Sequence, residues 1–377
     1  MQEKIAASPA TARVEAPASE FLNLHEFVAK ARQNLSQNHW DYIVGGCESE
    51  TTLRRNRMAL DSVAFRPRVL RDVSMVDASV EVFGRKLRLP VMLAPVGSLE
   101  CFHPEAAAEI VRGTGAFGVA HMMSSVTEPG LERVAEAASE ALRIFQLYVR
   151  GDDAFVNDHI ERAIKNGFTA FCFTVDTAHY SRRERDLAKR YQTAGRRRVA
   201  GRKFQMELDW RTIDRIKQQY KIPLIIKGIA TAEDAKLAVE HGVEWVYISN
   251  HGGRQLDHGR GAMDVLPEVV DAVTGRAKIM IDGSFCRGSD IVKAIAAGAD
   301  LVGMGRMQCY ALAAGGAAGV VRMLELLEDE VQRCLGLLGV NTFAELNKSY
   351  LHMSAPVVTV PHVLSAFPLL TVEPWRY

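Results

Sequence analysis

Eight short apolar runs recur along the chain, and their spacing limits the possible folds. The runs lie at 89–94, 117–122, 144–148, 170–175, 223–227, 245–249, 278–282 and 300–304. Helical stretches are predicted between them at 104–113, 130–140, 154–166, 232–240, 263–273 and 289–297. Parallel neighbouring strands need long crossover connections, and eight strands can close a sheet on itself. The pattern therefore predicts an α/β fold, a (β/α)8 TIM barrel.

Two amphipathic stretches come before the first run and predict an N-terminal helical extension. One begins at Asn23, and the other lies around 40–44, where Gly45 and Gly46 end it. An open, doubly wound sheet is the alternative fold. It is less favoured because no G-x-G-x-x-G follows the first run, and because polar residues end nearly all eight runs instead of gathering at one switch point.

Length and composition fix the domain organisation and exclude several classes of protein. A barrel of about 250 residues with added segments accounts for most of the 377 residues. We expect a disordered extension at 1–22, the barrel at 23–350 with a basic lid at 182–208, and a hydrophobic tail at 351–377. The 46 basic and 45 acidic side chains nearly cancel, so net charge selects neither nucleic acid nor membrane as a partner. No run of eighteen apolar residues is present, so no membrane span is expected.

The cysteines and the N-terminus bear on location. Six cysteines occur without CxxC or Cys/His metal spacing, which predicts reduced, buried thiols and no metal site. Residues 1–20 lack the apolar core of a signal peptide. We therefore expect a cytoplasmic protein.

Polar side chains end strand after strand, and this is the main internal evidence for a site. In a barrel, the active site is built from the carboxyl ends of the strands and the loops that follow them. A simpler explanation is that polar residues mark where each strand meets water, but this does not explain why hydrogen-bonding or ionisable groups recur at nearly every end. The residues concerned are Gly97, Ser124, Gln146, Tyr148, Thr174, Asp176, Lys227, Ser249, His251, Arg254, Asp282, Gly283, Gly305 and Arg306.

The stretch 249–257, Ser-Asn-His-Gly-Gly-Arg-Gln-Leu-Asp, carries the most chemistry. It follows a buried strand and presents His251 and Arg254 three residues apart, a proton acceptor beside an anion clamp. Gly252 and Gly253 allow backbone angles that a Cβ forbids, and they let a planar ligand approach the main chain. Lys227 ends another buried strand, where it is expected to face a buried anion. The alternative for Lys227 is a structural ion pair with Asp282 or Glu244.

A basic segment interrupts the rhythm between the fourth and fifth strands. Between 182 and 203 it holds ten basic residues against two acidic ones. Such a run is commonly a solvated loop. At the rim of a barrel it also suits a mobile lid that attracts anionic substrates. A nucleic-acid binder is the least favoured interpretation, because only Tyr191 and Phe204 offer stacking aromatic rings there.

The nine residues at 249–257, with most of the chain from about Asn23 to about Tyr350, resemble the FMN-dependent L-2-hydroxy-acid oxidases and dehydrogenases. This is the family of glycolate oxidase, lactate oxidase and mandelate dehydrogenase. The resemblance implies FMN across the barrel mouth. Its implied contacts are Pro95, Val96 and Gly97 along the N5 edge, Ser124, Gln146, Thr174 and Ser249 around the ring, Lys227 near N1, and Asp282, Gly283, Arg287, Gly305 and Arg306 toward the phosphate.

The resemblance also implies a substrate site and a reaction. Arg183, Arg254, Tyr42 and Tyr148 match the residues that hold the carboxylate and hydroxyl of a small anionic 2-hydroxy acid. His251 is the implied base, oriented by Asp176. The implied reaction is oxidation of an L-2-hydroxy acid to the 2-oxo acid, with oxygen, a quinone or another acceptor taking the electrons. The resemblance suggests a homotetramer, in which the tail 351–377 packs on a neighbour.

Three positions depart from the family pattern. Cys286 stands where a phosphate-binding arginine is usual, so either Arg287 turns inward or Arg306 and backbone amides hold the phosphate. Val126 stands where glycolate oxidase has a tryptophan, which leaves room for a larger substrate. Gly97 replaces a frequent alanine, which is more usual in dehydrogenases. The alternatives are therefore a branch that oxidises a larger aryl hydroxy acid or a peptide-derived group, or an inert flavin-binding protein.

Overall fold

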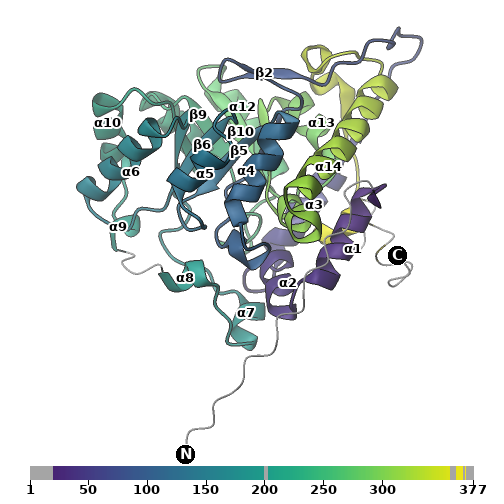
Figure 1. Cartoon of the computed structure of the whole chain (residues 1–377). Coiled ribbons are helices and arrows are strands. Elements are labelled where there is room, and N and C mark those ends of the chain that lie inside the picture. The colour runs from purple at the N-terminus through teal and green to yellow at the C-terminus, as the bar shows by residue number, and fades with distance from the viewer. Residues whose placement is uncertain (1–19, 199–202, 357–361, 368–369, 371–377) are drawn as a thin grey trace, which may run out of the picture.

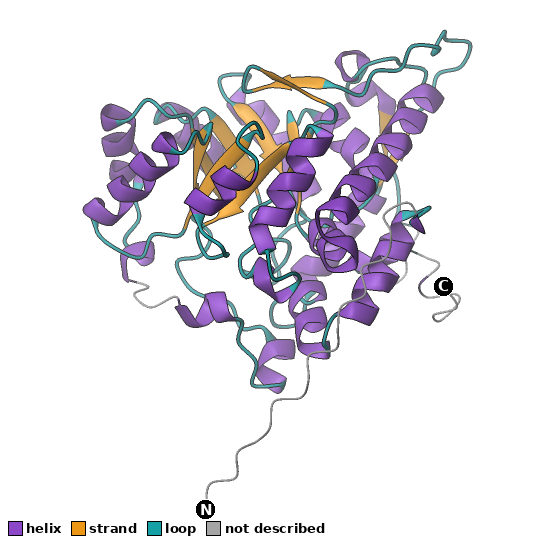
Figure 2. Cartoon of the chain, viewed as in Figure 1, coloured by secondary structure: helices purple, strands orange, loops and turns teal. Residues whose placement is uncertain are grey.

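The computed structural model describes residues 20–198, 203–356, 362–367 and 370. Eight parallel strands form a closed barrel inside a ring of helices (Figures 1 and 2), in the order β10-β11-β4-β5-β6-β7-β8-β9. The prediction of a (β/α)8 TIM barrel is confirmed. The strands are β4 (Val91–Leu93), β5 (Ala120–Ser124), β6 (Arg143–Leu147), β7 (Ala170–Thr174), β8 (Leu224–Ile229), β9 (Trp245–Ile248), β10 (Lys278–Ile281) and β11 (Leu301–Met304).

The largest error in strand position concerns β5, which was expected from residue 117. Phe117 is instead the last residue of the preceding helix, and Gly118 ends that helix in the left-handed region at φ +97°. A left-handed C-terminal glycine is a common way to end a helix. The apolar run thus contains the end of one element and the start of the next.

The helices are α1 (Leu24–Asn34), α2 (Gln37–Val44), α3 (Thr51–Asp61), α4 (Ala106–Phe117), α5 (Leu131–Ala137), α6 (Asp153–Lys165), α10 (Trp210–Gln219), α11 (Ala232–Glu240), α12 (Ala262–Val273), α13 (Gly288–Ala297) and α14 (Arg306–Leu338). Short 3-10 turns lie at Leu99–Cys101, Phe343–Glu345, Lys348–Tyr350 and Val363–Ala366. The predicted extension is present as α1 and α2, and Asn23 caps α1 with its side chain. Helix α3 was not anticipated.

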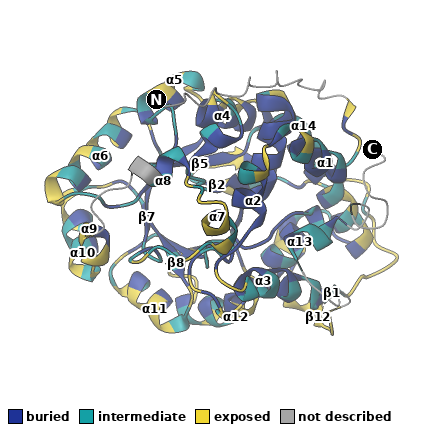
Figure 3. Cartoon of the chain, turned by 90° about the horizontal axis from the view of Figure 1, so that it is seen from below, coloured by how far each residue is buried: buried dark blue, intermediate teal, exposed yellow. Residues whose placement is uncertain are grey.

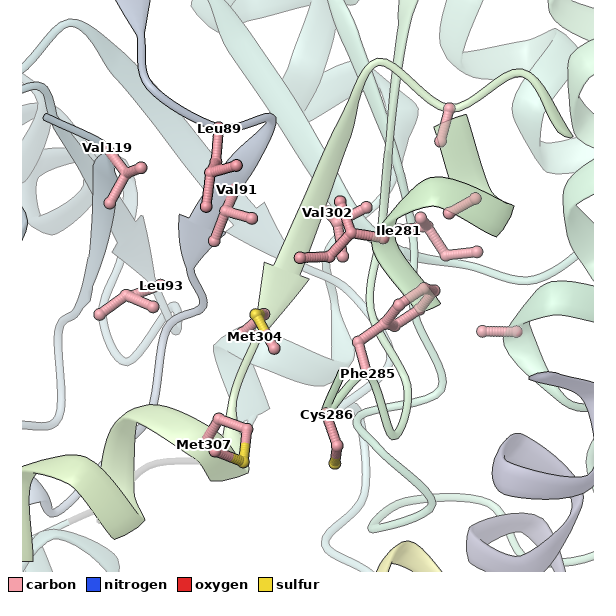
Figure 4. Close-up of a cluster of buried hydrophobic side chains, with 14 of the residues drawn as sticks. Leu89, Val91, Leu93, Val119, Ile281, Phe285, Cys286, Val302, Met304 and Met307 are labelled. Carbon is pink, nitrogen blue, oxygen red and sulfur yellow. The ribbon is translucent and has the colours of Figure 1, made fainter. Parts of the chain in front are cut away.

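The barrel is closed at one end and open at the other. A hairpin of β2 (Val80–Val82) and β3 (Arg85–Leu87) covers the amino ends of the strands, where Phe83 stacks on Trp245 with centroids 4.8 Å apart. An apolar layer lies between the strands and the outer helices, and Figure 4 shows the part of it around Val91, Val302 and Met304. Because both faces of the sheet are covered, the strands read as continuous apolar runs.

Helix α14 is long and apolar. Among the described residues it is the one helix with the length and composition to cross a membrane, at a mean hydropathy of 1.3 over 18 residues. Of that window, 67% is buried within the protein. It packs against α4, α1 and α13, so it is accounted for as a core helix of the barrel. Gly315 and Gly316 interrupt its helical angles.

Parts of both terminal segments pack against the body of the protein. Phe21, placed in the disordered extension 1–22, is buried and stacks on Phe27 with centroids 4.1 Å apart. Residues 1–19 lie outside the described residues. In the tail, β12 (Leu351–Met353) pairs antiparallel with β1 (Val63–Phe65). Phe367 is fully buried against His25. These parts of the tail pack on their own chain, whereas Leu369 and Trp375 lie outside the described residues.

The basic segment folds into short helices rather than a single loop. They are α7 (Glu184–Ala188), α8 (Ala194–Arg198) and α9 (Lys203–Met206). Seen from below, α7 lies over the middle of the barrel ring beside α2, with α8 near the rim (Figure 3). Arg185 forms a bidentate ion pair with Glu50 at 2.7 and 2.8 Å, and Lys189 pairs with Asp41 in α2. The lid is therefore fastened to the N-terminal helices.

Candidate active site

A cavity lies at the carboxyl ends of the strands. This is the open end of the barrel, beneath the lid. Of the predicted site residues, those that line it are Tyr42, Pro95, Val96, Gly97, Val126, Tyr148, Arg183, Lys227, His251, Arg254, Asp282, Gly283, Gly305 and Arg306. Residues from separate strands thus meet at one place, as a barrel requires.

His251 lies between a carboxylate and a phenol. Its Nδ1 is 3.1 and 3.2 Å from the two carboxylate oxygens of Asp176, and its Nε2 is 3.2 Å from the hydroxyl of Tyr148. An ionised carboxylate accepts hydrogen bonds only, so Nδ1 carries the proton and donates to Asp176. Nε2 then accepts a hydrogen bond from the hydroxyl of Tyr148, which lines the cavity. The predicted pairing of His251 with Asp176 is present.

The protonation states of these groups agree with that assignment. Burial lowers the pKa of His251, and the opposing attraction of Asp176 does not overcome this effect. Burial alone would raise the pKa of Asp176, but His251 and Lys227 hold that pKa below its usual value. Burial, followed by the charge of Asp176, raises the pKa of Tyr148 well above its usual value. At neutral pH Tyr148 is therefore a neutral donor, and His251 is a neutral imidazole able to accept a proton.

Two guanidinium groups flank Tyr42 at the outer side of the cavity. The Cζ atoms of Arg254 and Arg183 lie 4.8 and 5.7 Å from the centre of the Tyr42 ring. Arg254 donates to the carbonyls of Tyr42 at 2.6 Å and Gly45 at 2.8 Å. Burial and the nearby Arg183 lower the pKa of Arg254 to about 9. A bound anion would stabilise the two neighbouring positive charges. Each guanidinium is planar and offers paired N–H donors, which suit the two oxygens of a carboxylate.

Lys227 lies deeper in the cavity and is buried. Its Nζ donates to the hydroxyl of Ser249 at 2.8 Å and lies 3.7 Å from Asp282. Ser249 in turn donates to Asp282 at 2.7 Å. The structural ion pair considered as an alternative is therefore present with Asp282. Glu244 instead pairs with Lys217.

Several buried polar atoms in this region have no partner among the described residues. They are both amide atoms of Gln146 and the hydroxyls of Thr174 and Ser284. Ser124, next to Gln146 across the β5–β6 pair, is also buried. Leaving such groups unpaired costs about 1–3 kcal/mol each, so they indicate a bound polar ligand. A planar ring with carbonyl and nitrogen atoms, lying over these strand ends beside Lys227, would satisfy them, and the residues fit FMN.

The expectation that Arg287 turns toward the phosphate is not met. Its guanidinium pairs with Glu330 on α14 and donates to the carbonyl of Ala366 at 3.2 Å, outside the cavity. Cys286 is buried in the apolar layer (Figure 4). Arg306 does line the cavity, although it now donates to the carbonyls of Ile43, Gly45 and Gly252. Arg306 is thus the arginine that remains available at this end of the site.

Gly97 and Val126 form a matched pair. A Cβ on Gly97 would lie 2.8 Å from Cγ2 of Val126, closer than real Cβ contacts come. Tyr42 donates from its hydroxyl to the carbonyl of Gly97 at 3.1 Å. In this structure the absence of a side chain at residue 97 therefore fits the position of the valine at residue 126.

Some residues of the cavity were missed by sequence reasoning. Thr193 and Gly195 reach it from the lid segment, and Tyr180 lies just before that segment. Arg196 also lines the cavity, as one of the basic lid residues expected to attract an anionic substrate. Gln255 also lines it and donates to the carbonyls of Asp176 at 2.9 Å and His179 at 3.0 Å. Gln255 lies inside the 249–257 stretch, so its position beside His251 was the available signal. The contacts of the lid residues depend on a chain reversal that no local pattern encodes.

No group of three or more His, Cys, Asp or Glu side chains suited to a metal ion occurs in the part of the chain that the structure describes. All six cysteines are free. Five are buried, and Cys334 is partly exposed.

Comparison with known proteins gives a consistent answer. The family described as FMN-dependent dehydrogenase matches residues 31–353. Glycolate oxidase 3 of Arabidopsis thaliana is 35% identical, over 92% of this chain and 99% of that protein. L-lactate oxidase of Nostoc sp. is 34% identical, over 88% of this chain and 98% of that protein. A crystal structure of mandelate oxidase with (S)-2-phenylpropionate superposes with a TM-score of 0.82 at 34% identity, over 90% of this chain and all of that one.

Proposed function

This chain belongs to the FMN-dependent dehydrogenase family, and on that premise we propose that it oxidises an L-2-hydroxy acid to the 2-oxo acid. The observation that carries the proposal is the meeting of a neutral imidazole and two guanidiniums in one cavity. His251, Arg183 and Arg254 come from two loops that lie far apart in the sequence. A carboxylate held by the arginines brings its 2-hydroxyl toward Nε2 of His251.

The residues proposed to hold FMN are those that end the strands. Gln146 and Thr174 offer unpaired polar atoms to the ring, with Ser124 paired beside Gln146, and 95–97 lies at the same strand ends. Ser249 supports the site through its hydrogen bonds with Lys227 and Asp282. Lys227 supplies a fixed cation that stabilises negative charge on the ring. Asp282, Gly283, Gly305 and Arg306 are proposed for the ribityl phosphate, without Arg287. When bound, FMN supplies the two-electron acceptor that no side chain provides.

The proposed roles of the other residues follow from their donors and acceptors. Arg183 and Arg254 bind the carboxylate, and Tyr42 lies between them. Tyr148 donates a hydrogen bond toward the substrate oxygen. His251 takes a proton at Nε2 and becomes an imidazolium, which Asp176 stabilises through Nδ1–H. This last contact fixes both the orientation of the ring and its tautomer.

The electron acceptor, the cellular location and the oligomeric state are further proposals. The relatives named above are oxidases, which supports oxygen as acceptor, while Gly97 keeps a quinone or another acceptor open. Reduction of the flavin by a panel of hydroxy acids, followed with and without air, would decide between them. Free cysteines support a cytoplasmic location. A homotetramer is our proposal from the family and is tested by light scattering.

The substitution His251→Gln tests the assignment of the base. The amide keeps polar character without a basic lone pair, so we expect the purified variant to remain yellow with FMN. Anaerobic reduction of the flavin by a hydroxy acid should slow by about 10²–10⁴-fold. Stopped-flow absorbance measures this rate. Rapid bleaching by the variant would refute the role of His251, and a colourless wild-type protein would refute FMN as cofactor.

A further inference from the structure

Ser284 is a cavity residue whose hydroxyl the fold does not use. It follows β10 and lines the cavity together with Gly305 and Arg306, which follow the neighbouring strand β11. Ile281 and Val302 are paired in these two strands, so Ser284 and Gly305, each three residues beyond that pair, come at neighbouring strand ends. Ser284 is 7% exposed, and its hydroxyl has no hydrogen-bond partner among the described residues.

The backbone of Ser284 is held in a conformation that a side chain disfavours. Its φ is +64°, in the left-handed region, where residues with a Cβ are uncommon. Its carbonyl accepts a hydrogen bond at 3.3 Å from Arg57, which is itself fixed by ion pairs with Asp61 and Asp290. Glycine would adopt this φ with less strain. A serine with an orphaned hydroxyl in such a place points to a role outside folding.

One guanidinium remains for an anion at this end of the cavity. Arg306 donates to three backbone carbonyls, and within the described ranges no carboxylate lies at ion-pair distance from it. The charge of Arg57 is neutralised by its two carboxylates, and Arg287 is paired outside the cavity. Burial raises the pKa of Cys286 to about 12, so its thiol stays neutral. A phosphate monoester carries about 1.5–2 negative charges at neutral pH, so uncharged donors must supply part of its binding.

Ser284 also lies away from the groups proposed to bind the flavin ring. Gln146 and Thr174 end β6 and β7, and the closed strand order places these strands across the barrel mouth from β10 and β11. Helix α14 begins at Arg306, so the N–H groups of its first turn lie at the same end as Ser284. In parallel barrels, phosphates commonly bind at the loops after the seventh and eighth strands, which here are β10 and β11.

We propose that Ser284 binds the phosphate of FMN through its side-chain hydroxyl, alongside Arg306. The proposal rests on the FMN-dependent function proposed above. The hydroxyl donates its hydrogen to a phosphate oxygen and so gains the partner that the fold does not provide. Arg306 supplies the one positive charge, while the hydroxyl and the first-turn N–H groups of α14 supply uncharged donors. Ser284 thus compensates in part for the charge that Cys286 and Arg287 do not bring.

The test compares FMN with riboflavin, which has the same ring and ribityl chain without the phosphate. Apoprotein of the full chain is titrated with each flavin, and the quenching of flavin fluorescence gives the two Kd values. In Ser284→Ala we expect the Kd of FMN to rise by about 10-fold or more, the size expected of a hydrogen bond to a charged group. The Kd of riboflavin should stay nearly unchanged.

The variant Ser284→Gly separates the hydroxyl from the backbone. It removes the same hydroxyl but relieves the left-handed strain, so FMN should bind as weakly as to Ser284→Ala. The thermal midpoint of its apoprotein should stay at or above that of the wild type. The matched control is Ser289→Ala. Ser289 lies in the first turn of α13 and lines a separate surface depression with Arg287 and Glu330, so both Kd values should be kept.

The contrary results can be told apart. The role of Ser284 is overturned if Ser284→Gly binds FMN as tightly as the wild type, if riboflavin loses as much affinity as FMN, or if the wild type binds both flavins equally well. A lowered thermal midpoint of the Ser284→Gly apoprotein would also overturn it, because the hydroxyl would then support the fold itself. In all these cases the wild type still binds flavin and the proposed oxidation stands. If the wild-type apoprotein binds neither flavin, the proposed function fails and this inference fails with it.

Discussion

At the scale of single residues, the reactive histidine is held by its backbone as well as by its ring. His251 has φ +59°, in the left-handed region, which costs a residue with a Cβ roughly 1–2 kcal/mol. Its N–H donates to the hydroxyl of Ser249 at 3.0 Å. Gly253 follows at φ +76°, where a Cβ would lie 2.5 Å from backbone atoms of Leu53 in α3. The loop thus depends on a glycine pressed against a helix from the N-terminal extension.

The lowered pKa of His251 predicts the acid limb of the pH profile. A base must be neutral to act, so kcat/KM should fall as the pH drops through the His251 pKa. Because burial lowers that pKa, the fall should lie below the ordinary value of about 6.5. In Asp176→Asn the attraction that opposes burial is lost, so the limb should move to still lower pH. The rate at pH 7 should also drop, by roughly 10²-fold or more, because the imidazolium is no longer stabilised.

Steady-state profiles of wild type and Asp176→Asn over pH 4–9 provide the measurement, with the flavin spectrum recorded at each pH to exclude loss of FMN. A wild-type limb above pH 6.5, or a limb that moves upward in the variant, would contradict the assignment of His251 and Asp176.

At the scale of elements, small residues decide how closely the outer helices approach. Gly113 in α4 faces α14, where a Cβ would lie 2.7 Å from Cγ1 of Val320 and 3.0 Å from the carbonyl of Ala317. Gly336, near the end of α14, is the opposite case. A Cβ there would meet only Cγ2 of Val76, at an ordinary 3.8 Å.

Substitution of these two glycines by alanine should therefore affect the free energy of unfolding differently. Gly113→Ala overpacks the α4–α14 contact and should lower the free energy of unfolding by about 1–3 kcal/mol. Gly336→Ala gains helix propensity without a clash and should be neutral or stabilising by up to about 1 kcal/mol. Chemical denaturation followed by circular dichroism measures both. Equal effects of the two substitutions would show that the close packing at Gly113 is not what limits α4.

The lid is attached to the rest of the protein by contacts from several elements. Gln205 in α9 donates to the carbonyl of Thr174 at 2.8 Å and accepts from the N–H of Val149 at 2.8 Å. Together with the Arg185–Glu50 pair, this joins the lid to two strand ends and to the N-terminal extension. The basic segment is therefore more than a solvated loop, and its positive charge is partly used in fixed contacts.

At the scale of the whole molecule, the cofactor should contribute to stability. The orphaned groups of Gln146 and Thr174 gain partners only when a ligand binds the folded barrel. FMN at 100 times its Kd should add about 2.7 kcal/mol, which raises the midpoint of thermal unfolding by several degrees. Differential scanning fluorimetry of apoprotein with and without FMN measures the shift.

The variant Lys227→Met should show a smaller FMN-dependent shift, since a buried cation facing the ring is lost. Lys236→Met is the matched control, because Lys236 is 66% exposed and pairs with Glu240 on the surface of α11. An identical midpoint with and without FMN in the wild type would argue against cofactor binding at this site.

The sequence by itself determined the barrel and most of the site. Continuous apolar runs indicate strands that are buried on both faces of the sheet. Eight such runs joined by helix-length connections favour a sheet that closes into a barrel. Most of the proposed functional residues, Lys227 and His251 among them, lie at the end of a run or shortly after it, whereas Tyr42 comes from α2 and Arg183 from the basic segment. A parallel barrel brings all such positions to one end, so the meeting of these residues needed no knowledge of contacts.

Only the tertiary structure decided in which direction each side chain at this end of the barrel points. Arg287 faces away from the cavity because Glu330, 43 residues later in the chain, pairs with its guanidinium. Gly97 is matched to Val126, and Arg196 reaches the cavity because Gly195 fits against Ser98. Local patterns register periodicity and burial, whereas side-chain direction depends on partners that folding brings from distant segments.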